Sequence, residues 1–295
     1  MPPPPVVSVA MAMRNAAATI ALTLQSLIDQ SFADWELLLL DDGSSDDSVA
    51  TARRFGDPRI LVRADGRRLG LATRLNEAVA AARGRYIARM DADDVAYPER
   101  FARQVAFLEG HPEVDLLGAG AIVFDEAGLA IGKLPLRTEH REIAARPWNG
   151  FYLAHPTWMG RSGWFREYVY DTRMPKAQDY DLLLRSHAGS RFACLPEMLL
   201  GYRQERLSLA KILDTRLQLV QAVLRHGRRH GRYARPLIAA VQQAVKFGVD
   251  VLAISTGLDY RMLRHRALPV APEQREEWRQ IWQRLNRECA ERCAG

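Results

Sequence analysis

Residues 86–94 read Tyr-Ile-Ala-Arg-Met-Asp-Ala-Asp-Asp, a short, mostly apolar run that ends in three carboxylates. A second such run, Trp35 to Leu40, leads directly into Asp41, Asp42 and Gly43. Runs of this length and composition are typical of strands buried on both faces of a parallel sheet. Because open α/β sheets bind ligands at the carboxyl ends of their strands, the two acidic turns indicate a ligand site.

Helical patterns alternate with these strands. Apolar residues recur at helical spacing between about residues 20 and 28 and between residues 71 and 82, and Pro98 opens another helix. Further short apolar runs near residues 6–11, 60–62 and 114–124 read as strands. This alternation predicts an α/β fold with a mostly parallel central sheet and helices on both of its faces.

The composition of the chain excludes several classes of protein. The 295 residues are 48% hydrophobic and 26% charged, which excludes a mostly disordered or collagen-like chain. There are 41 Lys and Arg against 35 Asp and Glu, a net charge of +6 that suits an anionic partner. The three cysteines have no disulfide or zinc spacing, so we expect a reducing compartment. We expect no secretory signal, because residues 2–5 are prolines and neither a basic segment nor a long apolar one follows them directly. We expect no membrane-spanning segment, because the longest apolar stretch, near residues 237–258, is interrupted by polar residues.

The acidic turns have a specific electrostatic requirement. Neither a G-x-G-x-x-G fingerprint nor a phosphate-binding lysine loop is present in the sequence, which disfavours an ordinary dehydrogenase or P-loop ATPase. The carboxylates of Asp91, Asp93 and Asp94 would repel one another and any phosphate. A divalent cation between carboxylate and phosphate oxygens removes that conflict, and Mg²⁺ or Mn²⁺ is commonly bound in this way. The alternative is a loop whose acids merely cap the helix that begins at Pro98.

The ordered set of motifs resembles glycosyltransferase family two. The resemblance extends over about residues 6–206 and rests on these segments: Val7-Ser8-Val9 with Asn15, Ser31 to Leu37 leading to Asp41 to Asp46, Leu75 to Ala78, Ala82 to Asp94, His111 to Val114, His155-Pro156-Thr157, Asp179 to Leu182, and Tyr202-Arg203. It implies a Rossmann-like nucleotide-diphospho-sugar transferase (GT-A) fold. It also implies an enzyme that transfers a sugar from a nucleotide diphosphate donor, UDP- or dTDP-linked, to a hydroxyl group with inversion, in cell-envelope or polysaccharide biosynthesis.

The resemblance assigns roles to residues of this chain. Asp42 would contact the nucleobase, and Asn15 and His155 would also bind the nucleotide sugar. Asp91 would lie near the ribose and sugar and, with Asp93, would hold the Mn²⁺ or Mg²⁺ ion. The catalytic base would be Asp179. Each role has a simpler alternative: Asp42 and Asp179 can cap the helices that follow them, and a single histidine often makes only a structural hydrogen bond.

Some residues depart from the family pattern. Gln178 stands where Glu usually precedes the base, and Arg14 stands where many members carry an aromatic residue. These departures leave open a second hypothesis, a protein of the same fold that binds nucleotide sugars without turnover. A nucleic-acid-binding module is disfavoured, because the basic residues are scattered or confined to one turn and no stacking motif accompanies them.

We expect a catalytic domain over residues 1–206, with a nucleotide-binding half to about residue 125 and an acceptor half over 126–206, and a helical region over residues 207–295. A basic segment (Arg225, Arg228, Arg229, Arg232 and Arg235) precedes a helix with Leu237, Val241, Val245, Gly248, Val249 and Leu252 on one face. This pattern indicates either a helical appendage packed on the catalytic domain or a peripheral contact with an anionic membrane. We expect a cytoplasmic protein, and under the second alternative the contact would be at the inner face of the cytoplasmic membrane. The family resemblance implies a saccharide or lipid-linked saccharide as acceptor.

Overall fold

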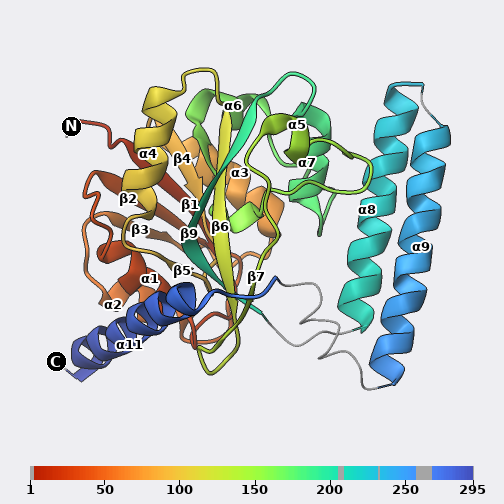
Figure 1. Cartoon of the computed structure of the whole chain (residues 1–295). Coiled ribbons are helices and arrows are strands. Elements are labelled where there is room, and N and C mark those ends of the chain that lie inside the picture. The colour runs from red at the N-terminus through yellow and green to blue at the C-terminus, as the bar shows by residue number, and fades with distance from the viewer. Residues whose placement is uncertain (1–2, 205–208, 232, 257–267, 295) are drawn as a thin grey trace.

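The structure is a computed structural model that describes residues 3–204, 209–231, 233–256 and 268–294. Figure 1 shows a curved central sheet with helices on both faces and a pair of long helices at one side. The strands are β1 (Val7–Met13), β2 (Trp35–Asp41), β3 (Ile60–Arg63), β4 (Tyr86–Arg89), β5 (Val95–Ala96), β6 (Leu116–Phe124), β7 (Ala130–Lys133), β8 (Met159–Arg161) and β9 (Phe192–Arg203). The α-helices are α1 (Ile20–Ile28), α2 (Ser48–Arg54), α3 (Leu71–Ala81), α4 (Arg100–Gly110), α5 (His140–Ile143), α6 (Ser162–Glu167), α7 (Gln178–Ser186), α8 (Leu209–Arg229), α9 (Ala234–Ser255) and α11 (Pro272–Ala294), and a 3₁₀ turn, η1, spans His155–Thr157.

The strand order places the acidic turns at one edge of the sheet. The order is β3-β2-β1-β4-β8-β6-β9-β5, with β7 paired to β6. The first four of these strands are parallel, and Val7 of β1 lies opposite both Trp35 of β2 and Tyr86 of β4. The carboxyl ends of β1, β2 and β4 therefore meet, and with them the turns that contain Asn15, Asp42 and Asp91.

The other half of the sheet is mixed. Strand β8 runs antiparallel to both of its neighbours, β4 and β6, whereas β6 and β9 are parallel. The sequence pattern did not indicate β8, because its three residues are too few to show a strand period. The predicted parallel arrangement thus holds for β3, β2, β1 and β4.

Two apolar layers cover the sheet. Helices α1 and α4 pack on one face through Ile20, Leu24, Phe101 and Leu108. Helices α3, α6 and α7 pack on the other face, where they contribute Leu75, Ala78, Phe165, Leu182 and Leu183 among others. The predicted α/β class and the C-terminal helices are confirmed.

The helical region expected from residue 207 onward meets the rest of the chain in two places. Helices α8 and α9 form a hairpin that packs against α7, with Ala222, Val223 and Ala239 beside Met174, Tyr180 and Leu184. Helix α11 instead crosses the sheet edge at β5, where Trp278, Ile281 and Leu285 pack with Val95, Tyr97 and Phe124. The expected boundary at residues 206–207 and Arg232 of the basic segment lie outside the described residues.

None of the helices in the described ranges is both long enough and apolar enough to cross a bilayer.

Candidate functional site

Three carboxylates cluster immediately after β4. The side chains of Asp91, Asp93 and Asp94 each offer an oxygen, and these oxygens lie within 4.8 Å of one another. Asp91 and Asp93 are partly exposed, whereas Asp94 is buried. The loop is short because β5 begins at Val95 and pairs with Gly201 of β9, which turns the chain back over the end of β4.

A buried cation balances this cluster. Arg89, the last residue of β4, is 3% exposed and donates from both terminal guanidinium nitrogens to the two carboxylate oxygens of Asp91. The charge of Asp91 keeps the pKa of Arg89 raised although burial opposes this. A guanidinium matches a carboxylate in this two-point geometry, which makes the pair directional as well as attractive.

Arg203, at the end of β9, ties the acidic loop to the rest of the sheet. Its backbone N–H donates to Asp94 Oδ1 at 2.9 Å, and its Nε donates to the carbonyl oxygen of Asp93 at 3.0 Å. The guanidinium lies 4.7 Å from the ring centre of Phe124 and 5.8 Å from that of Trp282 on α11. The C-terminal helix thus reaches the acidic loop through one arginine.

The cluster has the properties of a cation site. Burial, followed by the charge of Asp91, raises the pKa of Asp93 to about 6. Burial and the charges of Asp91 and Asp93 raise the pKa of Asp94 well above its ordinary value. Oxygen Oδ2 of Asp94 is buried and has no hydrogen-bond partner among the residues that the structure describes. A hard divalent cation would offset the repulsion among the three carboxylates and would give Asp94 Oδ2 a partner. The residues therefore fit Mn²⁺ or Mg²⁺.

Asp42 and Asn15 lie at the ends of β2 and β1, where they organise two neighbouring turns. Oxygen Oδ1 of Asp42 accepts hydrogen bonds from the backbone N–H groups of Leu69 (2.6 Å) and Gly70 (2.9 Å), and it also lies 3.3 Å from Nε of Arg74. Asn15 adopts a positive φ of 50° and accepts a hydrogen bond from the backbone N–H of Ser45 at 2.9 Å. Asp42 therefore holds the start of α3 rather than capping α2.

His155 is buried among aromatic side chains. Its Nε2 is 2.8 Å from the hydroxyl oxygen of Tyr170, and its ring packs edge-on against Trp158. Burial, with a smaller effect of Arg89, holds the pKa of His155 well below its ordinary value, so the ring is neutral at pH 7. The Tyr170 backbone is in turn held at both its N–H and its carbonyl by the Asn76 side chain, each at 2.9 Å.

Asp179 lies in the first turn of α7. The residue before this helix, Ala177, has a left-handed backbone with φ of 54°, a conformation that residues with a side chain rarely adopt. Burial raises the pKa of Asp179, while the backbone N–H of Tyr180 and the charge of Arg89 lower it. Asp93 and Asp179 thus share two electrostatic neighbours, Arg89 and Asp91.

Arg89 thus pairs directly with Asp91, and its charge also acts on Asp93, Asp179 and His155, while Asp42 and Asn15 lie at the ends of the neighbouring strands β2 and β1. Sequence reasoning left Arg89, Asn76 and Arg203 without roles and did not single out Tyr170. For Arg89 a signal was present, because an arginine inside an apolar strand must be paired when it is buried. Tyr170 carried no such signal, since its partners lie 15 and 94 residues away in the chain.

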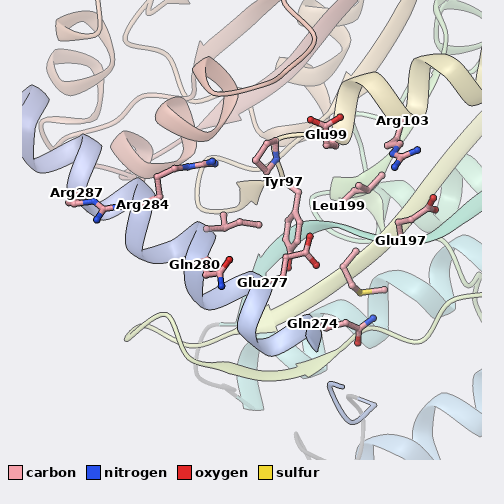
Figure 2. A pocket seen from close by; sticks show the side chains of 13 residues that line it. Tyr97, Glu99, Arg103, Glu197, Leu199, Gln274, Glu277, Gln280, Arg284 and Arg287 are labelled. Carbon is pink, nitrogen blue, oxygen red and sulfur yellow. The ribbon is translucent and has the colours of Figure 1, made fainter. Parts of the chain in front are cut away.

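A separate cavity of about 690 Å³ lies between α11, the start of α4 and β9 (Figure 2). Its lining includes Tyr97, Glu197, Glu277 and Arg284. The hydroxyl group of Tyr97 is buried and, within the described ranges, has no hydrogen-bond partner. Burial and the nearby charge of Glu277 raise its pKa. The predicted catalytic carboxylates are not among the residues that line this cavity.

Comparison with known proteins identifies relatives over most of the chain. The family model described as glycosyl transferase family 2 matches residues 8–169. EpsE of Bacillus subtilis (strain 168), a protein named as a glycosyltransferase, is 33% identical over 255 residues, which are 81% of this chain and 91% of EpsE. The succinoglycan biosynthesis protein ExoO of Rhizobium meliloti is 28% identical over 300 residues, 90% of this chain and 85% of ExoO. WfgD of Escherichia coli, a UDP-Glc:α-D-GlcNAc-diphosphoundecaprenol β-1,3-glucosyltransferase, is 35% identical over 102 residues, 35% of this chain and 40% of WfgD.

Solved structures share the fold at low sequence identity. The mannosyltransferase PcManGT of Pyrobaculum calidifontis, in complex with GDP-Man and Mn²⁺, has a TM-score of 0.62 and 17% identity over 96% of this chain and 87% of that chain. TarS 1-349 of S. aureus in complex with UDP-GlcNAc has a TM-score of 0.58 and 16% identity over 95% of this chain and 80% of that chain. These structures share the predicted GT-A fold, and the family match covers more than half of the sequence. The chain is therefore a glycosyltransferase and belongs to glycosyl transferase family 2.

Proposed function

We propose that the protein transfers a sugar from a UDP- or dTDP-linked donor to a hydroxyl group of a saccharide, with inversion at the anomeric carbon. One observation carries this proposal: the charge of the buried Arg89 acts on Asp91 and Asp93, which follow β4, and also on Asp179, which lies far along the chain in α7. An inverting transfer needs charge neutralisation on one side of the anomeric carbon and a base on the other. The two groups of carboxylates meet those two needs.

The donor diphosphate would lie at the acidic loop. Asp93 and Asp91 would hold Mn²⁺ or Mg²⁺, with Asp94 Oδ2 as a further oxygen ligand. When bound, the cation would neutralise negative charge on the departing diphosphate. The Mn²⁺ in the PcManGT complex supports this assignment. Because Asp91 is already paired with Arg89, its orientation is set before the donor arrives.

The nucleobase would lie at the ends of β1 and β2. Asp42 would contact the base while its Oδ1 stays bound to the backbone of Leu69 and Gly70. Asn15 would contact the donor beside it. His155 would form part of the wall of the donor site, with its ring position set by Tyr170. Support for a UDP donor comes from the TarS complex with UDP-GlcNAc and from the donor in the name of WfgD.

Asp179 would act as the general base. The attacking hydroxyl group must lose a proton as it bonds to the anomeric carbon, and a carboxylate within hydrogen-bond reach accelerates such a step by about 10²–10⁴-fold. The raised pKa of Asp179 makes its carboxylate a better proton acceptor than an exposed aspartate. The backbone N–H of Tyr180 and the charge of Arg89 oppose this rise and favour the ionised carboxylate.

The acceptor would be a saccharide or lipid-linked saccharide used in building a cell-envelope or extracellular polysaccharide. The names of ExoO and WfgD support this class, because they specify succinoglycan and a diphosphoundecaprenol-linked sugar. Such a lipid-linked acceptor implies that the enzyme works in the cytoplasm at the inner face of the membrane.

The Asp179→Asn variant tests the proposal. We expect it to bind UDP-sugar with unchanged affinity by calorimetry and to lose transfer by at least about 10²-fold. The exposed Asp34→Asn serves as the matched control and should retain full activity. Unchanged transfer by Asp179→Asn would remove it as the base. Binding of nucleotide sugars without any transfer by the wild-type protein would instead favour the second hypothesis, a binding protein of the same fold.

A further inference from the structure

The hairpin of α8 and α9 buries polar side chains between its two helices and exposes apolar side chains on α9. Figure 1 shows α9 on the outer side of the hairpin, with α8 between it and the rest of the molecule. The side of α9 that faces α8 combines apolar and polar residues: Ala239 packs with Ala222 and Val223, and Gln243 and Asp250 are also buried. Arg216 of α8 donates to Gln243 Oε1 at 2.7 Å and to Asp250 Oδ2 from Nε at 3.0 Å. Polar contacts therefore make up part of the buried interface between α8 and α9.

The outer side of α9 carries apolar residues that are exposed in the described part of the chain. We call Leu237, Ile238, Val241, Val245, Val249 and Leu252 the α9 apolar face; each is between 51% and 65% exposed. Their spacing of three and four residues aligns them along one side of the helix. Gly248 lies on the same side with open space around it. A contiguous apolar surface of this kind marks a binding site rather than a chance exposure.

The same segment carries the positive charge of the protein. Residues 209–256 contain eight Lys and Arg and two Asp, so their formal charge equals the whole net charge of +6. Both Asp residues form ion pairs, Asp214 with Lys176 and Asp250 with Arg216. Arg228, Arg229 and Arg235 are exposed near the turn between the helices, together with Tyr233. The rest of the chain is formally neutral.

We propose that α9 lies in the surface of an anionic phospholipid bilayer, with the α9 apolar face inserted among the lipids and the arginines of the turn bound to lipid phosphates. An amphipathic helix with basic flanks binds to membranes in this way, and Tyr side chains are common at the depth of the headgroups. A second copy of this chain is a poorer occupant, because two hairpins of charge +6 would repel each other on contact. The proposal concerns the attachment of the enzyme and is independent of the transfer reaction proposed above.

Co-sedimentation of the full chain with vesicles tests this inference. We expect binding to an equimolar mixture of phosphatidylglycerol and phosphatidylcholine, weak binding to phosphatidylcholine alone, and a decrease with added salt. Val245→Glu should weaken vesicle binding at least about tenfold, because it places a charge in the middle of the apolar face. Leu129→Glu is the matched control, since Leu129 is equally exposed but lies elsewhere, and it should bind like the wild type.

The charge and the apolar face can be tested separately. Arg228→Glu combined with Arg229→Glu should remove the preference for phosphatidylglycerol and leave transfer to a soluble acceptor unchanged. Equal vesicle binding by the wild type, Val245→Glu and the double arginine variant would overturn the proposal. The proposal would also be overturned if the wild type did not bind vesicles and instead formed a dimer. Sedimentation velocity would show such a dimer as concentration-dependent and as dissociated by Val245→Glu. Activity is measured on the same samples, so failure of the membrane proposal is distinguishable from failure of the proposed reaction.

Discussion

Both carboxylate oxygens of Asp91 accept hydrogen bonds from the guanidinium group of Arg89, which is buried beneath the acidic loop. Arg89 also lowers the pKa values of Asp93 and Asp179 through its charge. One cation therefore compensates three carboxylates that the proposed reaction needs in their ionised forms. Its removal should affect folding and catalysis together.

We expect Arg89→Met to destabilise the protein by about 3–5 kcal/mol at pH 7.5, since it leaves buried carboxylates without their counter-charge. Protonation of those carboxylates removes the conflict, so the loss should become smaller at pH 5. Chemical denaturation of the wild type and variant at both pH values measures this. A loss that is equal at the two pH values would contradict the role of Arg89 as the counter-charge.

Asp93 should oppose folding in the absence of a cation. Its pKa of about 6 in the folded chain exceeds its ordinary value of 3.8, so the folded state binds the proton more tightly than the unfolded state. That contribution to stability is present below about pH 4 and is lost as the pH rises through 6. Asp93→Asn should therefore stabilise the cation-free protein at pH 7.5 by about 1–3 kcal/mol.

The same variant should lose its response to Mn²⁺. We expect Mn²⁺ to raise the melting temperature of the wild type and of the exposed control Asp47→Asn, and to leave that of Asp93→Asn unchanged. Thermal denaturation with and without Mn²⁺ measures both effects. A variant that is less stable than the wild type without cation, or that still responds to Mn²⁺, would argue against Asp93 as a ligand.

The pH dependence of transfer should report on Asp179. At saturating Mn²⁺ Asp93 stays ionised, so the acidic limb of kcat belongs to the base. Because burial raises the pKa of Asp179, the rate should fall tenfold per pH unit, to first order, below a midpoint that lies above its ordinary value of 3.8. Initial rates between pH 4 and 8 give the midpoint. A rate that stays constant down to pH 4 would exclude this assignment.

The packing of α11 against the sheet edge at β5 should be essential for the stability of the protein. Trp278 is 1% exposed, donates from its indole nitrogen to the carbonyl oxygen of Gly128 at 2.8 Å and packs on Phe124. Trp278→Ala should cost about 3–5 kcal/mol of unfolding free energy, the usual range for truncating a buried tryptophan. Denaturation in urea measures this. The exposed Arg279→Ala on the same helix is the control and should change stability by less than about 0.5 kcal/mol.

Local patterns predicted the parallel half of the sheet, because β2 and β4 are buried on both faces and their apolar runs end in acids. They could not predict β8, because its three residues are too few to show a strand pattern and form a strand through their pairing with β4 and β6. That Trp278, Ile281 and Leu285 lie on one side of α11 was predictable from their spacing. Its place over β5 was not, since that depends on Gly201, where an added Cβ would lie 2.2 Å from the Trp278 side chain.

By itself the sequence determined the chemistry of the carboxylates, the family and the amphipathic character of the C-terminal helices, because these follow from residue types at short spacings. Only the tertiary structure decided which groups meet. The counter-charge of Arg89, the support of His155 by Tyr170 and Asn76, and the outward direction of the α9 apolar face all depend on contacts between distant segments. Such contacts leave no periodic signal, since burial and pairing are set by the packing of the whole chain.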